Sequence, residues 1–165
     1  MEIERKFLLK KFPPLPTYEE YEVTQGYISI DPEVRIRKKV ALAGESKGHV
    51  DCKLTVKGDG LLEREEIETT ISEEVFERLK NFIGKPMIQK IYRRYHLGDK
   101  VLECSAVDLS LPSAFIYAEI EFESKQDAQA FQWPFQDGVE VTYDQDFKMK
   151  RYWERTRLNT EQLGT

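Results

Sequence analysis

The first nine residues alternate between charged and mainly apolar side chains, which predicts an extended strand. Successive side chains of a strand point to opposite faces, so Glu2, Glu4 and Lys6 share one face. Most apolar residues of the segment lie on the other face, together with Arg5. Two carboxylates one pleat apart are separated by roughly 7 Å, from a rise of ~3.3 Å per residue. This spacing suits a shared hard cation, and a neighbouring lysine suits a phosphate group.

Seven further segments show a strand-like pattern, and short turns join most of them. They span residues 22–30, 33–40, 49–57, 62–71, 87–97, 100–107 and 115–123. Short connections favour antiparallel neighbours, and closing such a sheet into a barrel removes its exposed edges. Apolar spacing and caps predict helices over residues 72–83, after Ser124, and over residues 144–157. We therefore expect one α+β domain over residues 1–165: an eight-stranded antiparallel β-barrel with helices packed on the outside and a frayed tail from residue 158.

The overall composition excludes several classes of protein. A formal net charge of −5 and a pI of about 5.3 argue against a broad nucleic-acid surface, because phosphate backbones select basic proteins. No apolar run approaches the ~20 residues of a membrane span, and the charged start does not fit a secretory signal. Cys52 and Cys104 are too few for a disulfide scaffold and lack the spacing of a CxxC pair. We expect a cytoplasmic protein that binds neither nucleic acid nor membranes.

The charged strand faces repeat acidic and basic side chains along the whole chain. The acids are Glu2, Glu4, Glu66, Glu68, Glu119 and Glu121; the bases are Lys6, Arg35, Arg37, Lys53, Lys57 and Arg64; Lys90, Arg94 and Glu103 lie on two further strands. One interpretation is an ordinary open sheet, in which these charged faces would be exposed to solvent and would have no further role. In a closed barrel they would line a lumen, where charges must be paired or hold ions and water. Carboxylate clusters imply Mg²⁺ or Mn²⁺, and cation clusters imply a polyanion with adjacent phosphates.

An ExExK motif at residues 2–6 is followed, in order, by six further motifs. They are Gln25-Gly26-Tyr27, Arg35-Ile36-Arg37, Leu54-Thr55-Val56-Lys57-Gly58, Arg64 with Glu66 and Glu68, Ala118-Glu119-Ile120-Glu121, and Glu140-Val141-Thr142. One ExExK is a weak signal, but this ordered series covers most of the chain. It resembles the CYTH, or triphosphate tunnel metalloenzyme, superfamily. The resemblance implies an eight-stranded antiparallel tunnel with helices outside, in agreement with the strand pattern.

The resemblance also implies roles for the charged residues. The metal, Mg²⁺ or Mn²⁺, would be held by Glu2, Glu4, Glu119 and Glu121, with Glu103 as a further ligand. Phosphates would be held by Lys6, Arg35, Arg37, Lys57 and Arg64, with Lys53, Lys90 and Arg94 as further candidates. The catalytic group would comprise Glu4, Lys57, Glu66 and Glu68, the last two by shaping the field or by positioning metal or water. Arg93 is the alternative to Arg94, which the strand alternation favours.

The sequence departs from the family pattern at two places. Family members often carry a Glu-x-Asp pair on the seventh strand, whereas here Glu103 is followed by Ser105 at the Asp position. The residue that would replace this Asp as a metal ligand is therefore not assigned, and Asp108 could supply the carboxylate from the next loop. The last helix normally opens near an Asn, whereas this chain offers Lys148.

The combined hypothesis is a metal-dependent triphosphatase that acts on a small-molecule triphosphate: tripolyphosphate, or a nucleoside or thiamine triphosphate. One alternative is a class IV adenylyl cyclase, which the same superfamily includes, although the sequence offers no set of residues to read adenine. A second alternative is a non-catalytic polyphosphate-binding module, which the Ser105 departure keeps open. The sequence also leaves open which triphosphate is the substrate. It does not decide whether the protein is a monomer or a homodimer.

Overall fold

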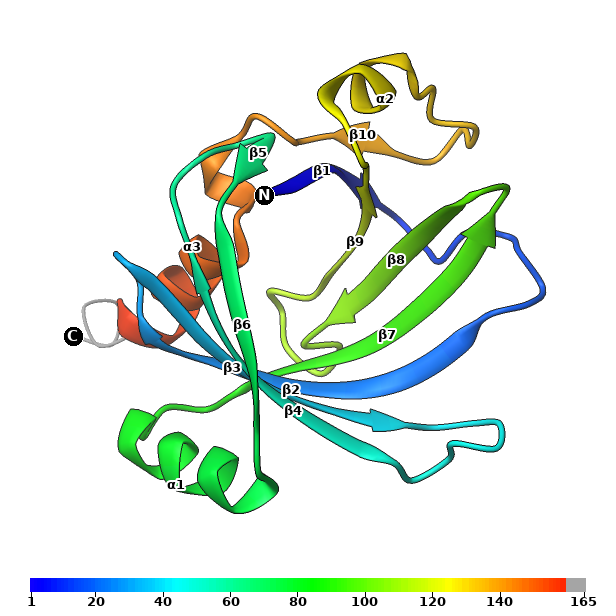
Figure 1. Cartoon of the computed structure of the whole chain (residues 1–165). Helices are drawn as coiled ribbons and strands as arrows, with labels where there is room; N and C mark the ends of the chain where they lie inside the picture. Colours follow the sequence, from blue (N-terminus) through cyan, green and yellow to red (C-terminus); the bar gives the residue numbers. More distant parts are fainter. Residues whose placement is uncertain (160–165) are drawn as a thin grey trace.

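A computed structural model describes residues 1–159, which form one strongly curved antiparallel sheet with short helices around it (Figure 1). Within these residues the sheet has ten strands in the order β10-β1-β9-β8-β7-β2-β3-β4-β6, with β5 also paired to β1. The strands are β1 (Glu2–Leu9), β2 (Glu19–Ser29), β3 (Glu33–Ala41), β4 (Val50–Lys57), β5 (Glu63–Arg64), β6 (Glu66–Ile71), β7 (Ile88–Leu97), β8 (Lys100–Val107), β9 (Phe115–Glu121) and β10 (Val139–Glu140). From residue 160 on, the expected frayed tail lies outside the described residues.

The two ends of the sheet are brought together by β5 and β6. The start of β1 pairs with β5, where Glu2 lies opposite Arg64 and Ile3 opposite Glu63. Strand β6 pairs with β4, and only Glu65 separates it from β5. The expected antiparallel barrel is confirmed, with the two-residue strands β5 and β10 in addition to eight longer strands in the described part of the chain.

Two apolar clusters fix the helices against the barrel. The first joins Ile36 of β3 to Phe76 of helix α1 (Glu73–Ile83) and Trp153 of helix α3 (Met149–Trp153). The second contains Phe7 of β1, which stacks on Trp133 with ring centroids 4.3 Å apart. These contacts cover the apolar faces of the strands, so the alternating charged faces turn toward the barrel interior.

The helices begin and end at residues whose side chains or backbone suit helix termini. Helix α1 (Glu73–Ile83) starts where the Ser72 side chain accepts a hydrogen bond from a backbone N–H, and it ends at Gly84 with φ 64°. Helix α2 (Lys125–Ala130) starts after Ser124 in the same way. In the described part of the chain, no helix is long and apolar enough to cross a membrane.

The expectation of one continuous helix over residues 144–157 is wrong. The segment consists of a 3₁₀ turn η1 (Gln145–Phe147), a short helix α3 (Met149–Trp153) and a π-helical turn η2 (Glu154–Leu158). Lys148 interrupts it because its backbone is extended, with φ −67° and ψ 139°. The residues on the two sides of this break, Phe147 and Met149, both face the barrel interior.

Candidate active site

The barrel interior holds a polar cavity of about 240 Å³. Most of the residues singled out from the sequence line it. They are Glu2, Glu4, Lys6, Arg35, Arg37, Lys57, Arg64, Glu66, Glu68, Glu103, Glu119 and Glu121. These residues come from seven strands, so the curvature of the sheet gathers side chains that are far apart in the sequence.

The register of β1 against β9 concentrates acidic side chains on one wall. Glu4 lies opposite Glu121, and Lys6 lies opposite Glu119. On the next strand, Glu103 of β8 also lies opposite Glu119. Like charges directly opposite one another are destabilising, so this wall requires cations or protons between its carboxylates.

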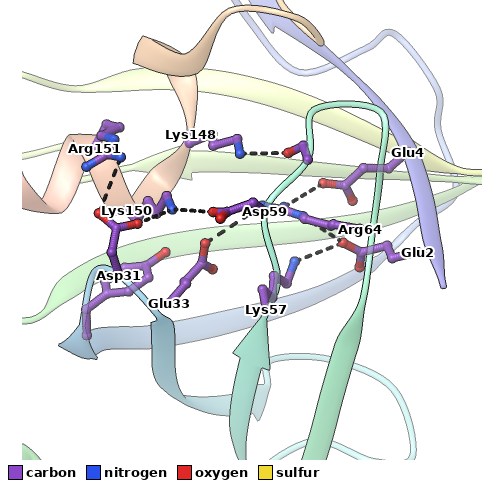
Figure 2. Close-up of polar contacts among 12 residues, drawn as sticks. Glu2, Glu4, Asp31, Glu33, Lys57, Asp59, Arg64, Lys148, Lys150 and Arg151 are labelled. Atoms are coloured by element: carbon purple, nitrogen blue, oxygen red, sulfur yellow. Dashed lines mark hydrogen bonds and ion pairs between the residues drawn. The ribbon is translucent and has the colours of Figure 1, made fainter.

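Arg64 on β5 supplies part of that positive charge. Its Nη2 lies 3.2 Å from Glu4 Oε1, and its Nε lies 3.4 Å from Glu2 Oε1 (Figure 2). Its Nη1 lies 3.7 Å from Glu33 Oε1 on β3. Lys57 Nζ donates to Glu2 Oε1 at 3.0 Å. All five side chains are at most 17% exposed, so these contacts are weakly screened by solvent.

Two hydrogen bonds join carboxyl groups in this cavity. One lies between Glu2 and Glu66, and the other lies between Glu4 and Glu119. The hydrogen bond with Glu2, followed by burial, raises the pKa of Glu66 to about 7. Burial and repulsion by Glu119 raise the pKa of Glu4 well above its usual range. Burial opposes ionisation of Glu119, but Lys6 and the hydrogen bond with Glu4 hold its pKa below its usual range. Each pair therefore keeps one carboxyl ionised and favours a proton on the other.

Arg35 and Arg37 on β3 face the same cavity from the other side. Arg37 Nε donates to Gln25 Oε1 at 3.2 Å. Arg35 is 7% exposed, and among the described residues no acceptor reaches its buried Nε. Buried polar atoms are nearly always hydrogen-bonded, so an unpaired guanidinium donor beside a cavity indicates a place for an anionic ligand.

Two basic residues expected in the site lie outside the cavity lining. Lys53 Nζ donates to Thr70 Oγ1 at 2.8 Å, and Arg94 Nη1 pairs with Glu19 Oε2 at 3.0 Å. Both side chains lie on the inward face of their strands, but they lie farther along the barrel than the cavity. Arg93 packs over aromatic rings on the opposite face of β7, as the alternation of the strand predicts.

Lys90 also lies outside the cavity lining, but it contacts Tyr117, which is part of the lining. Its Nζ donates to the Tyr117 hydroxyl at 2.6 Å, and burial lowers the pKa of Lys90 well below its usual range. Ser105 shares a hydrogen bond with the same hydroxyl. The cation and the serine thus reach the cavity through the tyrosine that lines it.

Asp108 does not reach the cavity, so the expectation that it could complete a metal site is wrong. Its carboxylate accepts from Arg157 Nη1 at 2.7 Å, from the Tyr152 hydroxyl at 2.5 Å and from the Gln89 N–H at 3.0 Å. It is 4% exposed. These partners satisfy its oxygens just beyond the end of β8, next to the C-terminal segment.

Several lining residues were missed from the sequence, among them Glu33, Tyr27 and Lys148. Glu33 and Tyr27 could have been found, because the first shares its strand face with Arg35 and the second follows the inward Gln25 by two residues. Lys148 stands where the last helix of the family normally opens near an Asn, but it lies on no strand, so strand alternation could not place it in the lining.

The carboxylates have the donor chemistry of a hard divalent cation, which prefers oxygen ligands. Within residues 1–159, however, no group of three or more His, Cys, Asp or Glu side chains is already arranged around a common point. Instead, the acids are hydrogen-bonded to each other through shared protons, and they form ion pairs with Arg64 and Lys57. A cation bound here would replace those protons, which is how carboxylate sites couple metal binding to proton release.

No protein-family model matches the chain, but comparison with known proteins finds similar sequences and structures. An inorganic triphosphatase from Nitrosomonas europaea is 32% identical over 152 residues, which cover 90% of this chain and 94% of that protein. The crystal structure of the inorganic triphosphatase NE1496 matches with a TM-score of 0.62 and 29% identity, covering 92% of this chain and 93% of that one. A conserved hypothetical protein from Pyrococcus furiosus shares the fold, with a TM-score of 0.50, 23% identity and coverage of 79% and 83%. The chain therefore belongs to the same protein family as the Nitrosomonas europaea inorganic triphosphatase.

Proposed function

We propose that this protein is a metal-dependent triphosphatase of the triphosphate tunnel metalloenzyme, or CYTH, superfamily, acting in the cytoplasm. Its substrate would be a small-molecule triphosphate, with inorganic tripolyphosphate as the first candidate because the related protein bears that name. The observation that carries the proposal is the cavity, where paired carboxyl groups face buried cations and the Arg35 Nε has no partner among the described residues. Adjacent phosphates of one molecule match several fixed cations at once.

The metal ligands in this proposal are the acids of one wall: Glu2, Glu4, Glu119, Glu121 and Glu103. Mg²⁺ or Mn²⁺ held there would polarise phosphoryl oxygens and offset their charge. The contribution of the chain is to bring these carboxylates together on three adjacent strands, β1, β8 and β9. Glu4 and Glu119 are hydrogen-bonded to each other, so they already lie close enough to share a proton, and so to share a cation instead.

The phosphate ligands would be the lining cations Lys6, Arg35, Arg37, Lys57 and Arg64. In phosphoryl transfer, charge spreads over the oxygens of the transferred group, and fixed cations in a water-poor site stabilise it. Lys57 and Arg64 also contact Glu2, so they would connect the carboxylate wall with the phosphate chain. Lys53, Lys90 and Arg94 lie outside the lining, and we assign them only a supporting electrostatic role.

Glu66 is our candidate for orienting the attacking water. Its carboxyl group lines the cavity beside Glu2, where it would accept a proton from the attacking water, as a general base must. Glu68 lies at the exposed rim of the cavity and accepts a hydrogen bond from Thr55 Oγ1 at 3.0 Å, which fits a role in shaping the local field. Water attack on a terminal phosphorus needs no covalent enzyme intermediate.

The direct test is a panel of substrates against a panel of metals. Purified protein would be incubated with tripolyphosphate, pyrophosphate, ATP and thiamine triphosphate, each with Mg²⁺, Mn²⁺ or EDTA, and phosphate release would be measured. We expect release from tripolyphosphate that depends on the metal. Formation of cyclic AMP and pyrophosphate from ATP would instead indicate a cyclase. Tight binding of tripolyphosphate that stays intact with every metal would indicate a binding module.

A further inference from the structure

The hairpin of β7 and β8 carries Glu103, which lines the cavity (Figure 1). In this hairpin Glu103 lies opposite Arg94, and Ser105 lies opposite Tyr92. Diagonal neighbours on one face of an antiparallel pair remain within reach of aromatic side chains, so Tyr92 can contact Glu103. The Tyr92 hydroxyl does so, and it donates a hydrogen bond to the Glu103 carboxylate.

The strand neighbours of Glu103 do not hold its carboxylate. Arg94 pairs instead with Glu19, with 3.0 Å between Nη1 and Oε2. On the other side Glu119 of β9 lies directly opposite Glu103, and like charges in this arrangement repel. Within residues 1–159, no lysine or arginine forms an ion pair with Glu103. The hydrogen bond from Tyr92 therefore fixes the direction of this carboxylate.

The ring of Tyr92 is itself held by its neighbours. Tyr21 of β2 lies directly opposite Tyr92, and the two ring centroids are 5.7 Å apart. The Lys39 ammonium lies 5.9 Å from the centroid of the Tyr92 ring. Because packing against these side chains limits the rotamers of Tyr92, its hydroxyl meets the carboxylate from a fixed direction.

Ser105 makes the direction of Glu103 more important in this chain. It stands where the family pattern often has an Asp, but it is a neutral residue that is 3% exposed. Its side chain is hydrogen-bonded to the Tyr117 hydroxyl. Strand β8 therefore offers the cavity one carboxylate, that of Glu103.

We propose that Tyr92 is a positioning residue that holds the Glu103 carboxylate as a ligand for Mg²⁺ or Mn²⁺. The inference rests on the proposed function, which assigns Glu103 to the metal. Hydrogen bonds from groups that do not touch the metal orient its ligands, and losing one lowers metal affinity about 10- to 100-fold. Tyr92 does not line the cavity, so it acts through Glu103 and not on the substrate.

The test measures Mn²⁺ binding to the metal-free protein by calorimetry, with no triphosphate present. Tyr92→Phe removes the hydroxyl and keeps the ring, and we expect it to weaken Mn²⁺ binding about 10- to 100-fold. The matched control is Tyr21→Phe, because Tyr21 packs on the same ring and also lies outside the cavity lining. This control should bind Mn²⁺ as wild type does. In turnover, Tyr92→Phe should raise the KM for Mn²⁺ by a similar factor, with kcat at saturating Mn²⁺ little changed.

A double-mutant cycle with Glu103→Gln separates positioning of the carboxylate from a general effect on the fold. If Tyr92 acts through Glu103, Tyr92→Phe weakens Mn²⁺ binding no further in the Glu103→Gln background. Equal Mn²⁺ affinities of wild type and Tyr92→Phe would overturn the proposal, as would an equal loss in Tyr21→Phe or additive losses in the double variant. If wild type binds Mn²⁺ but releases no phosphate, the triphosphatase assignment fails while the binding series still decides the role of Tyr92. If wild type binds no Mn²⁺, both proposals fail.

Discussion

At the scale of single residues, the site is governed by carboxyl groups that cannot all ionise together. Glu66 shows this most clearly, because its hydrogen bond with Glu2 and its burial raise its pKa from 4.5 to about 7. In the unfolded chain the same carboxyl ionises near its ordinary value. The folded protein without metal therefore holds a proton that the unfolded chain has lost, over the range from about pH 4.5 to 7.

This difference predicts a pH dependence of stability. The contribution of Glu66 is fully present below about pH 4.5 and is lost as pH rises through about 7, because the folded state binds the additional proton. Thermal unfolding in EDTA should thus show a decrease in Tm over this range, and Glu66→Gln should make that decrease smaller. An identical pH profile for the variant and wild type would show that Glu66 ionises normally.

At the scale of elements, the C-terminal segment is the part whose structure the sequence did not reveal. Apolar spacing predicts one helix there, but two sets of long-range contacts divide it. Lys148 donates to the Gly60 carbonyl, and Arg157 donates to Asp108, which directly follows β8. Arg157 also donates to the Pro86 and Met87 carbonyls at 2.9 and 3.0 Å. Tertiary hydrogen bonds of this kind override local helix preference.

The pair of Arg157 and Asp108 should be the strongest electrostatic attachment of this segment. Both side chains are at most 4% exposed, and breaking a buried pair from one side leaves a charge without a partner. We expect Arg157→Met to lower the free energy of unfolding by about 3–5 kcal/mol in urea denaturation. The partly exposed pair of Lys38 and Glu73 provides the control, since Lys38→Met should cost only about 0–1 kcal/mol. A loss for Arg157→Met as small as that control would contradict this role.

At the scale of the whole molecule, the short connections between strands predicted the barrel, and strand alternation predicted the inward face of each strand. Glu2, Glu119 and Arg35 lie in the cavity as their positions in the strands predict. Alternation does not specify how far along the barrel a side chain lies, because that depends on strand register and stagger. Lys53 and Arg94 therefore lie on the inward faces of their strands, as alternation predicts, but outside the cavity lining.

Loops were predicted less well than strands for a related reason. Asp108 has the residue type of a metal ligand, yet its partners belong to the C-terminal segment, more than forty positions later in the chain. No periodicity in the sequence links such distant residues. The strand expected over residues 62–71 is divided at Glu65 into β5 and β6, and the sequence did not reveal that β5 pairs with β1.

The most direct test of the account is phosphate release from tripolyphosphate by wild type, Glu4→Gln and Glu65→Gln. Glu4 is buried between Arg64 and Glu119, whereas Glu65 is exposed between β5 and β6 and does not line the cavity. With Mg²⁺ or Mn²⁺ present, we predict that Glu4→Gln lowers kcat by orders of magnitude and keeps the circular dichroism spectrum of wild type. Glu65→Gln should retain wild-type kcat. Wild-type turnover by folded Glu4→Gln would contradict the central claim that this cavity hydrolyses triphosphate through its carboxylate wall.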